Sequence, residues 1–231
     1  MRALLILLVV LAIALVVGDR VAVVMAQNEI GRAIAAEYEL PHRPDVEIGG
    51  FPFLTQALDG HYRDIDIRIG DWSGYDISVR DLDVALADVS APLSDVVNSR
   101  TSHLVAAAAT ATAVVPYDVV QGFAPSGVES ISHGPEGLRA TGRFSVGAIT
   151  VPATVFVTVA PTEDGIEVTP VSVQAATGGP TLSLAVLRRT LTFVVPLQRL
   201  PLGARLTAIE PRADGLHVTA VAHDVRLDSL P

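Results

Sequence analysis

Histidine and cysteine supply many catalytic and metal-binding side chains, and this sequence offers neither in a pattern that such chemistry needs. The chain has 231 residues and no cysteine, which removes thiolate nucleophiles and thiolate-bound metals. Its histidines show no HxH or HExxH spacing that would let two imidazoles share one metal ion. We therefore predict no metal site, no cofactor and no catalytic set. The six histidines are His42, His61, His103, His133, His217 and His223.

Acidic side chains are dense between residues 64 and 88, where a calcium site would be the first chemistry to consider. The stretch has no D-x-D-x-D-G loop with a distal glutamate, and its carboxylates alternate with apolar residues, as on the solvated face of a strand. The sequence also has no G-x-S-x-G elbow and no phosphate-binding loop that ends in Gly-Lys-Ser/Thr. We predict that the protein is not an enzyme. A hydrolase is the weakest alternative, because no nucleophile can be paired with a base.

Arginine accounts for every cationic side chain, 16 in all, because the sequence has no lysine. A guanidinium is planar and permanently charged, and it suits phosphate or carboxylate groups. Arg188 and Arg189 are adjacent and Arg199 follows them, so these three are candidates for binding a phosphate. The alternative is that they are ordinary exposed arginines. The formal net charge of −9 argues against a nucleic-acid partner.

Two segments place bulky apolar residues among prolines. Gly49–Gly60 surrounds Pro52 with apolar side chains, and Phe193–Gly203 has the same character. Because proline cannot donate a ladder hydrogen bond, we expect an edge, a bulge or a loop at Pro52. Together the segments predict the mouth of an apolar cavity, and the alternative is that both are core-facing crossovers. The candidate lining residues are Phe51, Phe53, Leu54, Phe193 and Leu202.

The first 26 residues predict a signal anchor or a signal peptide. Arg2 precedes fifteen consecutive apolar residues, Ala3–Val17, which indicates a cytoplasmic N-terminus and an exported body at 27–231. Read as one helix to Ala26, the stretch is about 36 Å long, enough to cross a bilayer. We favour an uncleaved anchor. The alternative is a peptide cleaved after Ala26, which would release the body.

The body predicts one α+β domain, in which a long N-terminal helix packs in a strongly curved antiparallel sheet. Helical spacing continues to Pro41, and period-two alternation then predicts strands. The apolar positions change parity near Arg80-Asp81, which indicates a bulge or bend. Residues 106–115 favour a strand, and residues 93–97 and 117–122 predict single helical turns. Asp-Gly pairs before residues 166 and 216 predict hairpins.

Four segments of the sequence carry a resemblance when they are taken together: Asp19-Arg20, Gly49–Gln56 with Gly60 and Tyr62, Ala91–Asp95, and Leu200–Gly203 before the terminal Asp-Gly strand. They resemble the actinobacterial LmeA-like phospholipid-binding family. The resemblance implies an extracytoplasmic, membrane-associated domain that binds phospholipid. It also implies a tubular lipid-binding-like fold, with a long helix in a highly curved sheet, and a part in maintaining mannosylated lipoglycans of the cell envelope. It supplies no catalytic residues.

The leading hypothesis is therefore a membrane-tethered, non-catalytic phospholipid-binding protein. Its lining residues would hold acyl chains, and the three arginines would meet the headgroup. The predicted partners are phospholipid and the membrane, and the sequence does not identify a protein partner. The alternative function is an envelope adaptor that recruits a glycosyltransferase and has a filled interior without a lipid cavity.

Overall fold

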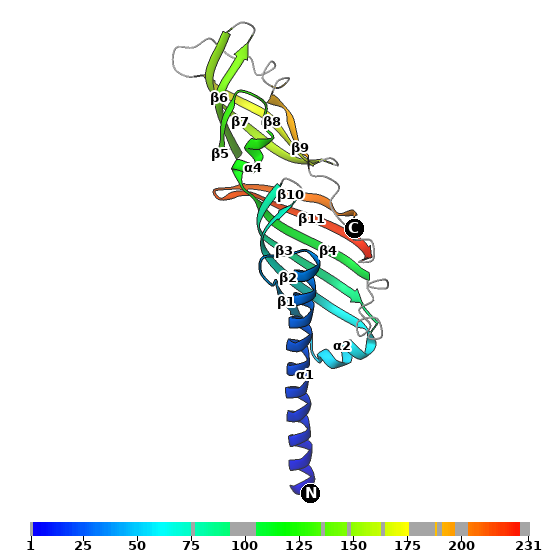
Figure 1. The fold of residues 1–231 in the computed structure, drawn as a ribbon. Helices are drawn as coiled ribbons and strands as arrows, with labels where there is room; N and C mark the ends of the chain where they lie inside the picture. Colours follow the sequence, from blue (N-terminus) through cyan, green and yellow to red (C-terminus); the bar gives the residue numbers. More distant parts are fainter. Residues whose placement is uncertain are drawn as a thin grey trace. The chain divides into compact units, whose positions relative to one another are not determined.

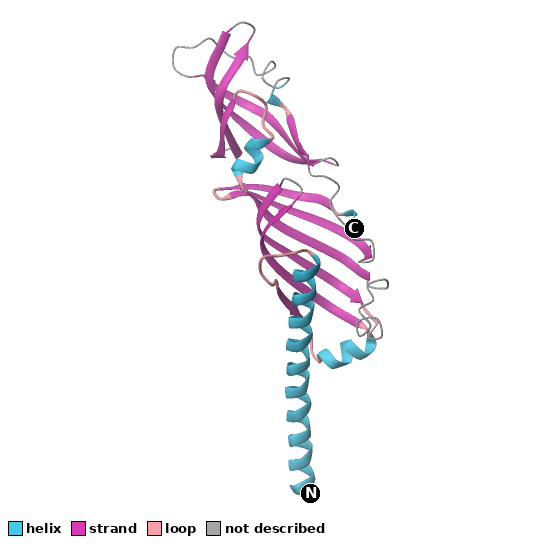
Figure 2. Ribbon diagram, viewed as in Figure 1, coloured by secondary structure: helices cyan, strands magenta, loops and turns pink. Residues whose placement is uncertain are grey.

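The protein is an α+β molecule with a long N-terminal helix and two antiparallel sheets (Figure 2). The computed structural model describes residues 2–74, 77–92, 105–134, 137–146, 149–162, 165–175, 188, 191–196 and 203–226. The predicted α+β class is confirmed, and the strands of these ranges do not close into a barrel. The strong curvature and the tubular arrangement stay predictions.

Contacts along the chain define two compact units. Unit 1 comprises Met1–Gly70, Asp83–Thr110 and Ala222–Pro231, and unit 2 comprises Asp71–Leu82 and Ala111–Val221. The division follows contact density alone. The prediction of a single extracytoplasmic domain over residues 27–231 stays a prediction.

Helix α1 (Arg2–Glu37) runs unbroken because the first proline of the sequence is Pro41. It ends where the sequence predicts, with Glu39 in a left-handed conformation (φ 49°). Its N-terminal half is exposed and apolar, and the helix is long and apolar enough to cross a membrane. This finding is compatible with the predicted signal anchor.

The C-terminal half of α1 packs against the rest of unit 1, where it lies beside β1 and α2 (Figure 1). Gly31 allows the closest approach, because a Cβ atom there would lie 2.9 Å from the carbonyl oxygen of Pro44. Val23, earlier in the same helix, is also buried. The apolar residues at helical spacing before Pro41 are covered only in part: Ile30 and Ile34 are half-buried, whereas Ala33 and Tyr38 are exposed.

A six-stranded antiparallel sheet follows α1, in the order β1-β2-β3-β4-β11-β10 (Figure 1). In the first pairing Val46 lies opposite Ile67 and Ile48 opposite Ile65, so their apolar side chains share one face. The alternation of isoleucine with aspartate and arginine in β2 leaves the other face polar. The strands are β1 (Asp45–Ile48), β2 (His61–Gly74), β3 (Ile77–Ser90), β4 (Val105–Val115), β10 (Arg205–Arg212) and β11 (Gly215–Arg226).

The second sheet has five antiparallel strands in the sequential order β5-β6-β7-β8-β9, and the short helix α4 (Tyr117–Gly122) precedes it. Its apolar face forms the core of unit 2. Leu138, Val155 and Ile166 are fully buried there, together with Leu216 of β11. The strands are β5 (Val128–Gly134), β6 (Gly137–Val146), β7 (Ile149–Thr162), β8 (Gly165–Ala175) and β9 (Phe193–Pro196).

Several local predictions are confirmed. The parity change in β3 coincides with Asp81, whose φ of 50° interrupts the regular extended backbone. The Asp214-Gly215 pair turns β10 into β11, residues 106–115 lie in β4, and residues 117–122 form α4. The helical turn predicted at residues 93–97 lies outside the described residues.

Candidate functional site

The structure brings three of the predicted lining residues together at one helix start. Phe51, Phe53 and Leu54 lie at the start of α2 (Phe53–Asp59), in unit 1. Phe193 and Arg188 belong to unit 2. Leu202, Arg189 and Arg199 lie outside the described residues.

Pro52 lies outside helix and strand, as expected for a loop, but the residues that follow it, 53–59, form helix α2, which the sequence did not predict. Pro52 is the N-cap with extended backbone, where its missing N–H is not needed, and the Thr55 hydroxyl donates to the Pro52 carbonyl at 2.8 Å. Gly60 ends the helix in a left-handed conformation (φ 68°). Pro52 is thus the residue at which helix α2 begins.

A carboxylate of α1 binds the first turn of α2. Asp19 is only 2% exposed, and its Oδ1 accepts a hydrogen bond from the Leu54 N–H at 2.8 Å. Its Oδ2 pairs with the Arg20 guanidinium at 2.6 Å. A free backbone N–H at a helix start attracts a negative charge, so Asp19 acts as a cap supplied by another helix. We call Asp19, Arg20, Phe51, Phe53 and Leu54 the α1–α2 junction.

Ring contacts complete the α1–α2 junction. The Arg20 guanidinium carbon lies 5.2 Å from the centre of the Phe51 ring, a cation–π distance. Phe53 is buried, with its ring centre 6.1 Å from that of Tyr62 in β2. Phe51 and Leu54 remain exposed. The α1–α2 junction thus fixes α2 to α1 on one side and to the sheet on the other.

The side chain of Gln56 fixes the segment before α2. Its Nε2 donates to the Gly49 carbonyl at 3.1 Å, and its Oε1 accepts from the Arg63 N–H at 3.1 Å. Gly50 has φ 87°, a conformation that favours glycine. The Gly-Gly-Phe-Pro-Phe-Leu-Thr-Gln run is therefore a local structural unit in which polar and apolar residues both have partners.

Replacing Asp19 with alanine is expected to release the first turn of α2. The Leu54 amide would lose an ionised acceptor, so its hydrogen exchange should accelerate by about tenfold or more. Exchange of the full-length protein in detergent, followed by mass spectrometry with fragmentation, measures this. Glu29→Ala is the control, because Glu29 is exposed and pairs with Arg32 on the surface of the same helix. Unchanged exchange at Leu54 in Asp19→Ala would show that Asp19 does not hold α2.

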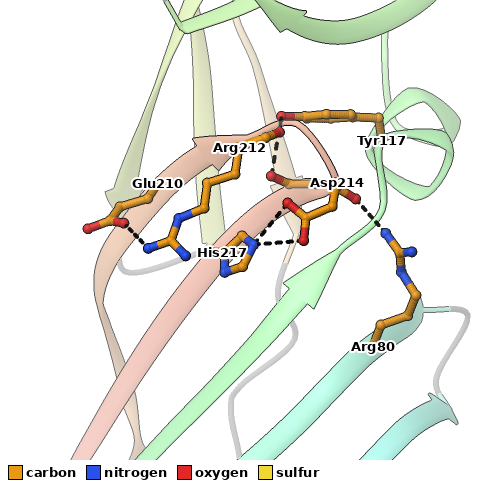
Figure 3. Close-up of polar contacts among 7 residues, drawn as sticks. Arg80, Tyr117, Glu210, Arg212, Asp214 and His217 are labelled. Atoms are coloured by element: carbon orange, nitrogen blue, oxygen red, sulfur yellow. Dashed lines mark hydrogen bonds and ion pairs between the residues drawn. The ribbon is translucent and has the colours of Figure 1, made fainter.

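A second polar group surrounds the β10–β11 turn of unit 2 (Figure 3). The Tyr117 hydroxyl donates to the Arg212 carbonyl, and the Arg80 guanidinium donates to the Asp214 carbonyl. His217 Nε2 lies 3.1 Å from each carboxylate oxygen of Asp214. Glu210 and Arg212 form a neighbouring ion pair at 2.8 Å.

This group stabilises a turn rather than presenting reactive atoms. The hydrogen bond with His217 is the main cause that holds the pKa of the Asp214 carboxyl below its ordinary value, and the charge of Arg80 acts in the same direction. Burial raises the pKa of the Tyr117 hydroxyl, which stays protonated and donates to backbone carbonyls. The donors and acceptors drawn in Figure 3 contact one another or the backbone of the turn.

Two further observations bear on ligands. Among the residues that the structure describes, no group of three His, Asp or Glu side chains is placed to hold a metal ion. A hollow of about 60 Å³ lies between α1 and β1 and is too small for an acyl chain. Its lining residues are Val24, Gln27, Asn28, Arg43, Pro44, Asp45 and Val46.

The family model of the LmeA-like phospholipid-binding proteins matches residues 17–221. The chain belongs to this family. The match begins two residues before Asp19 and ends in β11, so it includes the α1–α2 junction and both sheets. No curated protein and no solved structure gives a match.

Membership in the LmeA-like family indicates phospholipid as the ligand and gives no reason to expect a reaction. Asp19 and Gln56 are not among the site residues that the sequence predicts for this family member. The position of Asp19 inside an apolar helix could have indicated a structural role, because a buried charge needs a partner. The partners of Gln56 lie seven residues away on either side and follow from no motif.

Proposed function

We propose that the chain is a membrane-tethered, non-catalytic phospholipid-binding protein whose body lies outside the cytoplasm. The family match over residues 17–221 is the observation that carries this proposal. The apolar N-terminal half of α1 supports the tether, and Arg2 before it favours a cytoplasmic N-terminus. A role in maintaining envelope lipids or lipoglycans belongs to the same proposal.

The acyl chain would lie along the apolar side chains at the margin of the unit 2 core. Val159, Val168 and Phe193 lie opposite one another across β7, β8 and β9. Val168 is buried, whereas Val159 and Phe193 are half-buried, so a chain that covered them would remove apolar surface from water. Burial of each CH₂ contributes about 0.8 kcal/mol, which makes acyl contact the main source of affinity.

The headgroup would meet a guanidinium. Arg188 is exposed, and its Nε donates to the Pro170 carbonyl at 3.1 Å, which holds the side chain against the middle of β8. Its terminal NH groups suit a phosphate, and Arg189 and Arg199 are proposed to act with it. Leu202 is proposed as a further lining residue.

The pair Phe193→Ala and Val194→Ala tests the proposal. These neighbours are on opposite faces of β9, and Val194 is 42% exposed on the face away from the core. Phe193→Ala should weaken uptake of a fluorescent phospholipid from vesicles about tenfold, because it removes much of one aromatic side chain from the contact. Val194→Ala should leave uptake unchanged. Each variant would be shown to be folded by its thermal transition. Equal phospholipid uptake by both would show that the acyl chain does not contact Phe193 in β9. An adaptor without a lipid cavity predicts no uptake by any form of the protein.

A further inference from the structure

We propose that α2 is a second membrane contact. The apolar patch formed by Phe51, Leu54 and Leu58 lies in the boundary between headgroups and acyl chains, in the leaflet from which α1 emerges. The inference rests on the proposed function in one respect, because it takes α1 as the membrane tether. It adds a surface of the body that touches the bilayer and so fixes how unit 1 is oriented on it.

The two sides of α2 have different surroundings. Phe53 and Ala57, four residues apart, are buried against the body. Leu54 and Leu58, also four residues apart, are 40% and 74% exposed. Phe51, just before the helix, is 55% exposed. Three large apolar side chains that are exposed together on a short helix mark a surface that contacts something other than water.

The α1–α2 junction sets the depth of this patch. The hydrogen bond from Leu54 to Asp19 and the contact of Phe51 with Arg20 hold α2 against residues 19 and 20 of α1. In Figure 1, α2 lies crosswise beside α1 where the N-terminal half of α1 leaves unit 1. The patch is therefore at the level of α1 at which the apolar run Ala3–Val17 has just ended.

That level matches the edge of the hydrocarbon layer. The run Ala3–Val17 spans only about 22 Å at 1.5 Å per residue, whereas the hydrocarbon core is about 30 Å thick. About 20 residues are needed to cross it, which from Ala3 reaches Ala22. Asp19 and Arg20 thus lie within the last turn of the membrane-crossing segment, and the Leu54 N–H lies at the same depth.

A second membrane contact also explains how Asp19 is accommodated. A carboxylate near the hydrocarbon edge is unfavourable unless it is covered and paired. Asp19 is covered by α2 and paired with Arg20, whose side chain is 49% exposed and long enough to extend toward lipid phosphates. Phe51 and Leu54 then lie beside residues 19 and 20 of α1, at the end of its exposed apolar run. This position next to the membrane-crossing helix favours a bilayer over a protein as the occupant.

Site-specific fluorescence tests the proposal on the full-length protein. The chain has no cysteine, so single variants can each carry one environment-sensitive fluorophore. The probe positions are Leu58→Cys in the patch, Ala12→Cys in α1 as the membrane reference, and Val194→Cys in unit 2 as the aqueous reference. The protein is reconstituted into vesicles of phosphatidylcholine and phosphatidylglycerol. Quenching is measured with a nitroxide on the lipid acyl chains and, separately, with iodide in the water.

The proposal predicts that the probe at position 58 is quenched by the lipid nitroxide, as at position 12. It also predicts that iodide quenches position 58 at least about threefold less than position 194, because an interfacial helix buries its apolar face among lipids. Lipid quenching at position 12 with only iodide quenching at position 58 would overturn the inference and leave the tether in place. Protection of position 58 from both quenchers would also overturn it, and would indicate a protein or a second copy of the chain on the patch. Absence of lipid quenching at position 12 would instead refute the tether.

Discussion

Truncation of Phe53 to alanine is expected to lower the free energy of unfolding by about 3 kcal/mol, the usual loss for a buried phenylalanine. Phe53 is 7% exposed and is the main apolar anchor of α2 on Tyr62. Its removal should weaken the packing of α2 on the sheet, while the hydrogen bonds of Leu54 with Asp19 and of Gln56 with Arg63 remain. Chemical denaturation of the full-length protein in mild detergent measures the loss.

Leu58→Ala is the matched control for Phe53→Ala. Leu58 lies on the opposite side of the same helix and is 74% exposed, so its truncation should change stability in detergent by about 0.5 kcal/mol or less. Similar losses in the two variants would mean that α2 does not pack on unit 1 through Phe53. A large loss with Leu58→Ala alone would place the packed side of α2 on the other face.

Gly142→Ala is expected to have an effect of similar size in unit 2. A Cβ atom on Gly142 in β6 would lie 2.0 Å from the carbonyl oxygen of Gly127, a backbone atom that cannot rotate away. The same carbonyl accepts the Arg143 N–H at 2.8 Å, so the entry to β5 would have to separate from β6. We expect a loss of about 3 kcal/mol, at the upper end for overpacking, measured by thermal or chemical unfolding.

Gly122→Ala is the control for Gly142→Ala. No atom lies within 4 Å of a Cβ built on Gly122, and its φ is not positive. Alanine at the end of α4 should therefore be neutral or slightly stabilising. If Gly142→Ala were as stable as Gly122→Ala, that result would contradict the close approach of the Gly127 carbonyl to Gly142.

Sequence patterns among neighbouring residues predicted several elements of the fold. The absence of proline before Pro41 defines the length of α1, and the parity change at Asp81 locates an irregularity within β3. The Asp-Gly pair at residues 214 and 215 predicts the β10–β11 hairpin. In each case the signal lies within a few residues of the structural feature, so one sequence is enough to find it.

The α1–α2 junction could not be predicted in this way. Asp19 and Leu54 are 35 residues apart, and nothing in either segment specifies the other as its partner. The proline in the Phe-Pro-Phe run argued against a strand, but it was compatible with a loop or with a helix start. Whether an apolar side chain faces the core, a ligand or a bilayer depends on tertiary contacts. Phe53 and Leu54, adjacent in sequence, differ in this respect: one is buried and the other is exposed.

The central claim is that this chain binds phospholipid, and the amount of phospholipid that it retains tests this claim most directly. The full-length protein and Phe193→Ala would be purified in the same detergent and analysed by native mass spectrometry and lipid extraction. The amount of lipid held around α1 would be equal in the two forms, so a difference in retained phospholipid measures binding by the body of the protein. We expect at least one phospholipid to be retained per full-length chain and clearly less by Phe193→Ala. A full-length protein that carries no phospholipid and takes up none from added vesicles would contradict it.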